Sequence, residues 1–279
     1  MSVTTFETPG AVRLRIALGS GDVRIEATDE RRTEIELVAL RDDEATHLAI
    51  DEATVKAQDR ADGTEVVVEI PRKGSFGGLG GLLGRGPSVG IRVRCPHGAA
   101  VDASSQSADI VTKGLLDTLE ARTGSGDFDF DEVSTLRATT ASGDVAVRTI
   151  FGNGNVKTAS GDVSVREAHG NLSLNLVSGD AIVGTARGPL SVATVSGDQD
   201  IAAVQSGEVK LQSVSGDVRV GVRPGLRVWI DATSVSGSMS SDLAMDGAEY
   251  GEGEPAIELR ARTVSGDVRI VRADEPNLS

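Results

Sequence analysis

The tripeptide Ser-Gly-Asp recurs along this chain at a nearly constant spacing. An isolated copy begins at Ser20, and the altered copies Ser-Ala-Asp and Ser-Gly-Ser begin at Ser107 and Ser236. From Ser107 onward the steps between copies are 18, 17, 18, 18, 18, 19, 21 and 29 residues. A short, fixed period is typical of a solenoid, in which each repeat forms one coil that stacks on the next. The seven complete copies in this series begin at Ser125, Ser142, Ser160, Ser178, Ser196, Ser215 and Ser265.

Each repeat contains two segments with the pattern of a β-strand. One follows the Asp of the motif, and the other follows a second glycine, as in GNLSLNLV at 170–177 and GPLSVATV at 188–195. Apolar and polar residues alternate in both segments, as they do in a half-buried strand. The sequence therefore predicts an all-β chain, a single-stranded parallel β-helix (β-solenoid) of right-handed 18-residue coils with two strands each.

The alternation also predicts what each residue of the motif does. In an extended chain Val214, Gly216 and Val218 share one face, and Ser215 and Asp217 share the other. We expect the apolar face to point inward, so both valines would fill the core and Gly216 would lie at an inward bend. The Ser and Asp oxygens would then point outward and accept hydrogen bonds from backbone N–H groups at the bend.

The same assignment applies to every complete copy of the regular series. These residues are predicted to be structural corners rather than a row of reactive groups. The predicted corner residues are Gly126, Asp127, Gly143, Asp144, Gly161, Asp162, Gly179, Asp180, Gly197, Asp198, Gly216, Asp217, Gly266 and Asp267.

The regular repeats occupy the middle of what we expect to be one domain over residues 1–279. Irregular N-terminal coils precede them in 1–100, and these coils contain a short helix at 42–52 and a flexible Gly-rich loop at 73–89. The regular repeats are predicted at 101–240, and 241–279 is expected to form an acidic loop and a closing coil. The closing coil is assigned to the last motif, in RTVSGDVRIVRA.

The Gly-rich loop is the segment with the strongest signal for docking. It contains Gly-x-Gly spacings, but no Gly-Lys-Ser/Thr follows, so a phosphate-binding loop is disfavoured. Its apolar side chains distinguish it from a plain linker and suggest contact with a partner or a membrane surface. They are Phe76, Leu79, Leu82 and Leu83.

Metal-binding and catalytic interpretations are weaker than the structural one. Calcium-binding β-rolls use a glycine-rich nonapeptide, whereas this chain has one Gly and one Asp per corner at about twice that period. A Ser/His/Asp site needs one distinctive serine, and here the serines are interchangeable. Cys95 and His97 flank Pro96 and could form a nucleophilic pair, but a core cysteine is the simpler expectation. We therefore expect no catalytic residue, no metal and no cofactor.

Composition limits the partners and the compartment. The net charge is −14, which argues against nucleic acid, and aromatic residues are only 3% of the chain, which suits a thin core. Cys95 is the only cysteine, so an intramolecular disulfide is impossible and a reducing compartment is favoured. The beginning of the sequence does not resemble a signal peptide, and no apolar run is long enough to span a bilayer. A cytoplasmic location is the expectation, and membrane association is expected only through a partner.

The repeated SGDV blocks resemble the DUF4097 family, also called toastrack or candidate adhesins. The stretch VRLRIALGSGDVRIEA resembles the opening of the family, and IRVRCPHGAAVD resembles its entry into regular repeats. The resemblance covers nearly the whole chain and implies a β-helix without an established active site. It also implies that some relatives carry membrane segments and act in envelope-stress systems.

From these observations we expect a non-enzymatic scaffold or protein-interaction module with an unknown protein partner. Self-association through the end strands is a second expectation. The alternative is glycan or cell-envelope binding, and a polysaccharide-active enzyme is less favoured than either.

Overall fold

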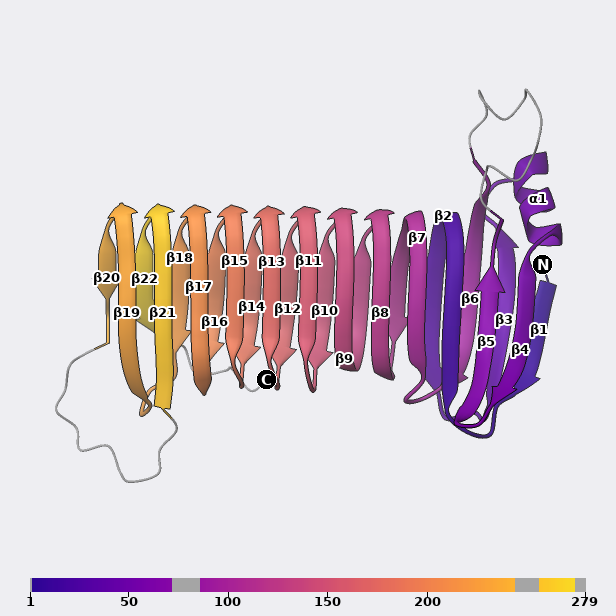
Figure 1. Ribbon diagram of the computed structural model, residues 1–279, viewed down its shortest axis with the longest axis horizontal. Helices are drawn as coiled ribbons and strands as arrows, with labels where there is room; N and C mark the ends of the chain where they lie inside the picture. Colours follow the sequence, from indigo (N-terminus) through magenta and orange to yellow (C-terminus); the bar gives the residue numbers. More distant parts are fainter. Residues whose placement is uncertain (1, 72–85, 244–255, 274–279) are drawn as a thin grey trace. The chain divides into compact units, whose positions relative to one another are not determined.

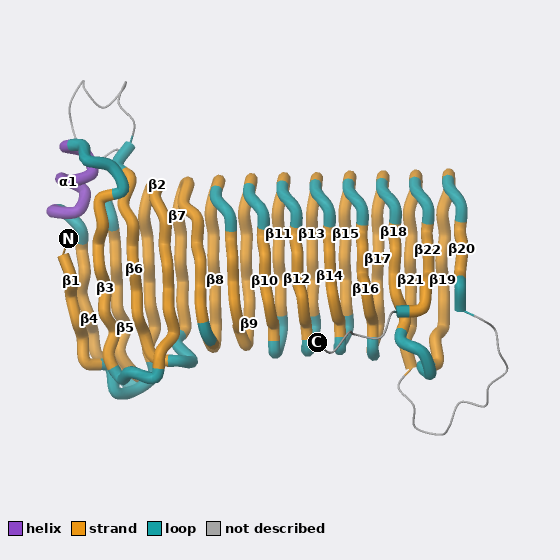
Figure 2. Tube along the Cα trace, turned by 180° about the vertical axis from the view of Figure 1, so that it is seen from behind, coloured by secondary structure: helices purple, strands orange, loops and turns teal. Residues whose placement is uncertain are grey.

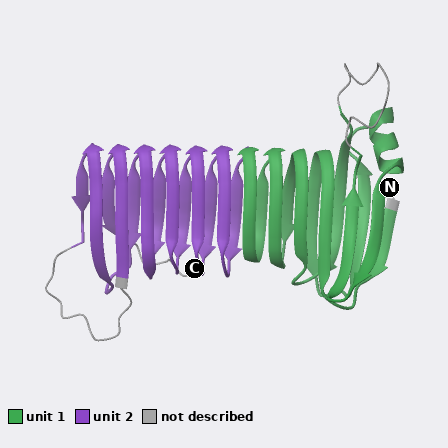
Figure 3. Cartoon of the chain, viewed as in Figure 1, with its two compact units in different colours: residues 1–141 green, residues 142–279 purple. Residues whose placement is uncertain are grey.

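The fold is taken from a computed structural model, which describes residues 2–71, 86–243 and 256–273. The described part is almost entirely β-strand, with one helix, α1 (Glu44–Asp51) (Figure 1). The predicted all-β solenoid is therefore confirmed. The chain divides into two compact units, Met1–Ala141 and Ser142–Ser279, which are coloured separately in Figure 3.

Unit 2 contains the regular coils, and its strands fall into two ladders. Every pairing is parallel, and each strand pairs with the equivalent strand one coil away. One ladder runs β10 (Val145–Ile150), β12 (Val163–Ala168), β14 (Ala181–Ala186), β16 (Gln199–Val204), β18 (Val218–Val222), β22 (Val268–Arg272) and β20 (Met239–Ser241). The other runs β11 (Gly154–Ser160), β13 (Leu172–Ser178), β15 (Leu190–Ser196), β17 (Gly207–Ser215), β21 (Ala256–Ser265) and β19 (Arg227–Ser236).

The core of unit 2 is built from columns of equivalent residues. Leu172, Leu190 and Val209 occupy the same position in successive coils, and all three are buried. Because coils related by parallel pairing lie one strand spacing apart, about 4.8 Å, each side chain packs directly on its counterpart. Small aliphatic side chains fill such a thin interior well, which explains why so few aromatic residues are needed.

The corner changes which residues point inward. Ser213 before the corner and Val218 after it are both buried, whereas Val214 is 50% exposed. The prediction that Val214 fills the core was therefore wrong. The alternation does not continue through the motif, because the chain turns at Gly216 and the inward positions shift by one residue. The equivalent valines Val177, Val195 and Val264 are exposed in the same way.

The close approach of neighbouring coils explains the corner glycine. Gly216 has a φ of +147°, and a Cβ placed on it would lie 2.2 Å from the carbonyl oxygen of Gly197 in the preceding coil. The obstacle is therefore the backbone of a neighbouring coil. Figure 2 shows these corners as short loop segments between the strands.

The last coils of unit 2 do not stack in the order of the sequence. Strand β21 pairs with β17 on one side and with β19 on the other, and β22 lies likewise between β18 and β20. The segment that was expected to close the stack is thus inserted, and the coil of β19 and β20 lies outside it. Strand β21 begins at Ala256, inside the acidic segment at 241–259 that was expected to form a loop. Residues 244–255 lie outside the described part.

Unit 1 is built around one long strand, β2 (Val12–Thr28), which pairs in parallel with β5, β6 and β7. Three further pairings, β1–β3, β3–β6 and β4–β5, are antiparallel, which the sequence did not indicate. The other strands of this unit are β1 (Ser2–Glu7), β3 (Arg32–Ala39), β4 (Thr54–Arg60), β5 (Gly63–Glu69), β6 (Ser88–Pro96), β7 (Ala100–Lys113), β8 (Leu115–Ser125) and β9 (Phe128–Ser142), whose last residue falls in unit 2.

The single helix packs on β3 and β6 of unit 1. Asp43 caps it, since its side chain accepts a hydrogen bond from the backbone N–H of Thr46 at 2.8 Å. Thr46 and Ala49 are buried, and the Thr46 hydroxyl accepts from the backbone N–H of Ser88 at 3.2 Å. The helix predicted at 42–52 is confirmed, with slightly narrower bounds.

The Gly-rich segment falls mostly outside the described residues. Its last two predicted residues, Ser88 and Val89, belong to strand β6 instead of a loop. The proposed docking side chains, Phe76, Leu79, Leu82 and Leu83, lie outside the described part of the chain.

Two glycine substitutions compare a corner that packs against the neighbouring coil with a turn that faces open space. Gly216 and Gly225 both have positive φ, but a Cβ at Gly225 would meet no atom within 4 Å. We expect Gly225→Ala to lower the free energy of unfolding by about 1–2 kcal/mol, from strain alone. Gly216→Ala should cost about 1–3 kcal/mol more, because the neighbouring coil must move and because a φ of +147° is more strained for alanine than a φ of +82°. Urea unfolding of both variants measures the difference, and equal losses would contradict the contact explanation.

Candidate functional site

The corner aspartates of unit 2 form a ladder of hydrogen bonds between coils. Oδ1 of Asp144 accepts from the backbone N–H of Asp162, and Oδ1 of Asp162 accepts from that of Asp180, both at 2.8 Å. The pattern continues through the inserted coil, where Asp217 accepts from Asp267 at 2.8 Å. The other bonds of the ladder have the same form. Oδ1 of Asp180, Asp198 and Asp267 accepts from the backbone N–H of Asp198, Asp217 and Ser238, respectively.

A second backbone bond supports each corner. The N–H of Gly161 donates to the carbonyl of Ser178 at 3.2 Å, and that of Gly216 donates to the carbonyl of Ser265 at 3.0 Å. These bonds run from the glycine N–H to one neighbouring coil, and the bonds from the aspartate N–H run to the other. Each corner is therefore hydrogen-bonded to both of its neighbouring coils. In unit 1, Asp109 accepts in the same way from the backbone N–H of Asp127 at 3.0 Å.

This geometry gives the aspartates a structural task. The backbone N–H of Ser238 lowers the pKa of Asp267, since a donated hydrogen bond stabilises the charged carboxylate. Carboxylate oxygens that accept such bonds are engaged by the protein itself. Over residues 2–71, 86–243 and 256–273, no three His, Cys, Asp or Glu side chains converge as a metal ion would require.

The cysteine that could have served as a nucleophile is buried in the core of unit 1. Cys95 has no exposed surface, and burial raises its pKa to about 12. Because the thiolate is the reactive form, this thiol is unreactive at neutral pH. His97 lies on the surface instead, with Nε2 at 3.8 Å from Oδ1 of Asp29. The simpler expectation, a core cysteine, is confirmed.

Each histidine of the chain has a different carboxylate neighbour. Nε2 of His47 lies 2.8 Å from Oδ1 of Asp42, and Nε2 of His169 lies 3.6 Å from Oε1 of Glu167. The three histidines therefore sit in separate places and do not form a shared acid–base site.

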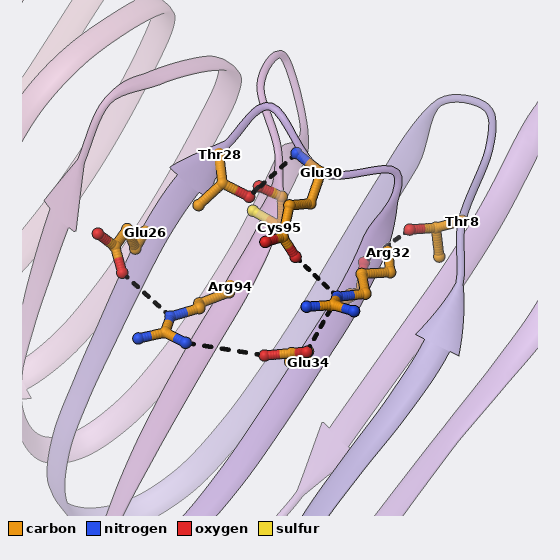
Figure 4. A network of polar contacts seen from close by, with 9 residues as sticks. Thr8, Glu26, Thr28, Glu30, Arg32, Glu34, Arg94 and Cys95 are labelled. Atoms are coloured by element: carbon orange, nitrogen blue, oxygen red, sulfur yellow. Dashed lines mark hydrogen bonds and ion pairs between the residues drawn. The ribbon is translucent and has the colours of Figure 1, made fainter.

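A chain of ion pairs crosses the outer face of unit 1 (Figure 4). Arg94 lies between Glu26 and Glu34, at 3.3 and 3.8 Å, and Arg32 lies between Glu34 and Glu30, at 3.0 and 2.7 Å. The two pairs of Arg94 line part of an open groove of about 500 Å³. Both signs of charge alternate there, so the groove favours no ligand of one charge. Exposed pairs of this kind contribute about 0–1 kcal/mol each.

The outermost coil of unit 2 exposes residues that are core residues elsewhere. Ile230 pairs in register with Leu259, which is fully buried, yet Ile230 is 38% exposed. Met239 pairs with Val268, which is also buried, yet Met239 is 57% exposed. The core columns therefore end at an open coil, which we define as β19 and β20. Among the described residues, β19 pairs with β21 alone, so its other edge is free.

The only tryptophan of the chain lies on this open coil. Trp229 is 54% exposed, and the guanidinium carbon of Arg260 lies 5.7 Å from the centre of its ring. A shallow hollow of about 630 Å³ borders the ring and includes Glu208 and Arg227. A second hollow of about 310 Å³ adjoins it, lined by Lys210, Gln212, Asp231, Arg260 and Arg262 as well as Trp229.

Sequence reasoning missed this surface. An available signal was the single Trp at an outward position of a strand, flanked by two branched apolar residues. The degenerate motif at Ser236, where Ser replaces Asp, was a second signal, because a terminal coil needs no aspartate to hold a further coil.

The family comparison agrees with the coil architecture. The family model described as Toastrack DUF4097 matches residues 11–271. The chain belongs to the DUF4097 family. No curated protein matches this DUF4097 chain. Over the described residues, it has no helix both long and apolar enough to cross a membrane.

Solved structures similar to this DUF4097 chain come from several bacteria. A candidate adhesin from Bacteroides fragilis is 12% identical with a TM-score of 0.46, and the match covers 96% of each chain. A candidate lipid-binding protein from Parabacteroides distasonis is 13% identical with a TM-score of 0.46, covering 98% of this chain and 96% of that one. A candidate cell adhesion protein from Clostridium sporogenes is 14% identical with a TM-score of 0.29, covering 97% and 98%.

The buried thiol gives a direct test of the core assignment. We expect native Cys95 to react with a thiol reagent at pH 8 far more slowly than the unfolded chain, because a pKa of about 12 leaves almost no thiolate. Absorbance after addition of Ellman's reagent, with and without urea, measures this. The Ser164→Cys variant, altered at an exposed site, supplies an accessible thiol as control. Native Cys95 reacting as fast as that control would contradict the assignment.

Proposed function

We propose that this DUF4097 chain is a non-enzymatic interaction module that binds a protein partner through its open coil. The observation that carries the proposal is the end of the core columns at Ile230 and Met239. An apolar surface beside a free strand edge is unfavourable in water. A partner strand would bury the apolar side chains and form hydrogen bonds with the free backbone groups. Strand addition is a common way of recognising a protein through such an edge.

The chemistry of the side chains supports a role without catalysis. The corner carboxylates accept backbone hydrogen bonds, and Glu26 and Glu34 of the unit 1 groove are paired with arginines. The one thiol is buried and protonated. No cofactor is part of the proposal, and a net charge of −14 disfavours nucleic acid as the partner.

The proposed location is the cytoplasm, as expected from the sequence. A single free cysteine buried in the core is compatible with a reducing compartment.

Glycan or cell-envelope binding is a second candidate, favoured by Trp229. An exposed aromatic ring offers an apolar platform with polar groups at its border, and here Gln212, Asp231 and Arg262 supply hydrogen-bonding groups. In this candidate the outer face of the ring is the binding element, whereas in the first candidate it is the edge of β19.

Capture of partners from the native cell tests the proposed function, with two matched variants as bait. Ile230→Asp places a charge on the open coil, and Ile182→Asp places the same charge on an exposed site of β14 within the stack. We expect Ile230→Asp to lose the protein partners of the wild-type bait and Ile182→Asp to keep them. The thermal unfolding of both baits should be similar.

The same experiment separates the two candidates. Retention of every partner by Ile230→Asp would contradict the proposed function. If the Trp229→Ala bait no longer binds cell-envelope glycan while the Ile230→Asp bait keeps its protein partners, the second candidate is favoured.

A further inference from the structure

We propose that the partner at the open coil is a second copy of this chain, with strand β19 of each copy pairing antiparallel to the other. This inference rests on the proposed function, because it uses the same open coil and names its occupant. The evidence comes from symmetry, charge and burial along β19.

Symmetry makes the antiparallel arrangement natural. Two identical strand edges related by a two-fold axis run in opposite directions, and antiparallel pairs exchange N–H and C=O bonds across their full length. Such an interface is closed at two copies. It therefore covers the free edge of β19 in both copies without building a filament.

Charge complementarity selects one register. Arg227 and Asp231 lie two residues before and two residues after Trp229, and all three are on the outward side of β19. In a register centred on Trp229, Arg227 of each copy lies opposite Asp231 of the other, so two ion pairs form. A register centred on Asp231 would instead place two carboxylates opposite each other.

The two side chains are available for these pairs. Arg227 is exposed and makes no ion pair with another residue of the described part. Asp231 lies 3.3 Å from Nη2 of Arg262, and its side chain keeps about a third of its surface exposed. A carboxylate has two oxygens, so Asp231 can accept from Arg227 of a second copy while it keeps Arg262.

The apolar residues of β19 fit the same register. Val228 of each copy lies opposite Ile230 of the other on the inward side, so the two open cores meet and continue each other. On the outward side the two Trp229 rings lie side by side, each with Arg260 over its face. A foreign strand would have to match this spacing of Arg, Trp and Asp, whereas a second copy matches it by symmetry.

Sedimentation equilibrium of the full chain tests the proposal. We expect a concentration-dependent dimer, with a shift of Trp229 fluorescence to shorter wavelength as the dimer forms, because the ring leaves water. Arg227→Asp alone should weaken the dimer on the order of tenfold or more, since it replaces two attractions with two repulsions. Asp231→Arg alone should do the same.

The charge-swapped variant, Arg227→Asp with Asp231→Arg, should restore the dimer, because the two ion pairs form again in reverse. Arg166→Asp, at an exposed site of β12, is the control and should leave the dimer unchanged. Circular dichroism melting checks that each variant is folded. If the charge-swapped variant does not fold, Arg227→Ala and Asp231→Ala are measured in its place. Each should weaken the dimer less than the charge reversal at the same residue.

The outcomes distinguish this inference from the proposed function. A wild-type chain that stays monomeric at every concentration would overturn the second copy as partner, while capture through Ile230 would still support an interaction module. A wild-type dimer that survives Arg227→Asp unchanged would overturn the register and the interface. Retention of all partners by Ile230→Asp would overturn the proposed function itself.

Discussion

The close approach of backbones at each corner is the constraint on which the rest of this structure depends. A side chain at Gly216 would lie 2.2 Å from the carbonyl oxygen of Gly197, so coils stack this closely only if glycine stands there. The turn at the same glycine shifts the inward positions by one residue and places Val214 outside. The aspartate that follows then reaches the backbone N–H of the neighbouring coil. One short motif thus sets the turn, the spacing and the hydrogen bond between coils.

Because the fold itself engages the groups of the motif, few of them remain to bind a ligand. The corner carboxylates are occupied by backbone donors, and the ladder passes from coil to coil without a special member. Function is therefore more plausible where the repetition stops. In unit 2 it stops at the coil of β19 and β20, where the motif has lost its aspartate and the core-facing residues Ile230 and Met239 are exposed.

The sequence predicted the architecture well because the period itself carries the information. Equal steps between motifs mean equal coils, and alternation within each step marks the strands. It failed at Val214 because alternation was extended through a corner, where the chain is not straight. It also failed at the end of the stack. The 29-residue step from Ser236 to Ser265 is long enough to let the following coil insert between two earlier coils. The pattern of residues within a coil does not indicate which other coil it stacks on. Trp229 lies at an outward position of its strand, which the alternation indicates, but the free edge of that strand follows from the order of the coils and was missed for the same reason.

Amide hydrogen exchange in the Asp217→Ala variant tests the central claim, that the corner aspartates tie each coil to its neighbour in space. Oδ1 of Asp217 accepts from the backbone N–H of Asp267, although Ser238 is the next corner in the sequence and donates to Asp267 instead. The account predicts faster exchange at the N–H of Asp267, with that of Ser238 little changed. Faster exchange at Ser238 with Asp267 still protected would contradict the order of the coils, and no change at either residue would contradict the ladder.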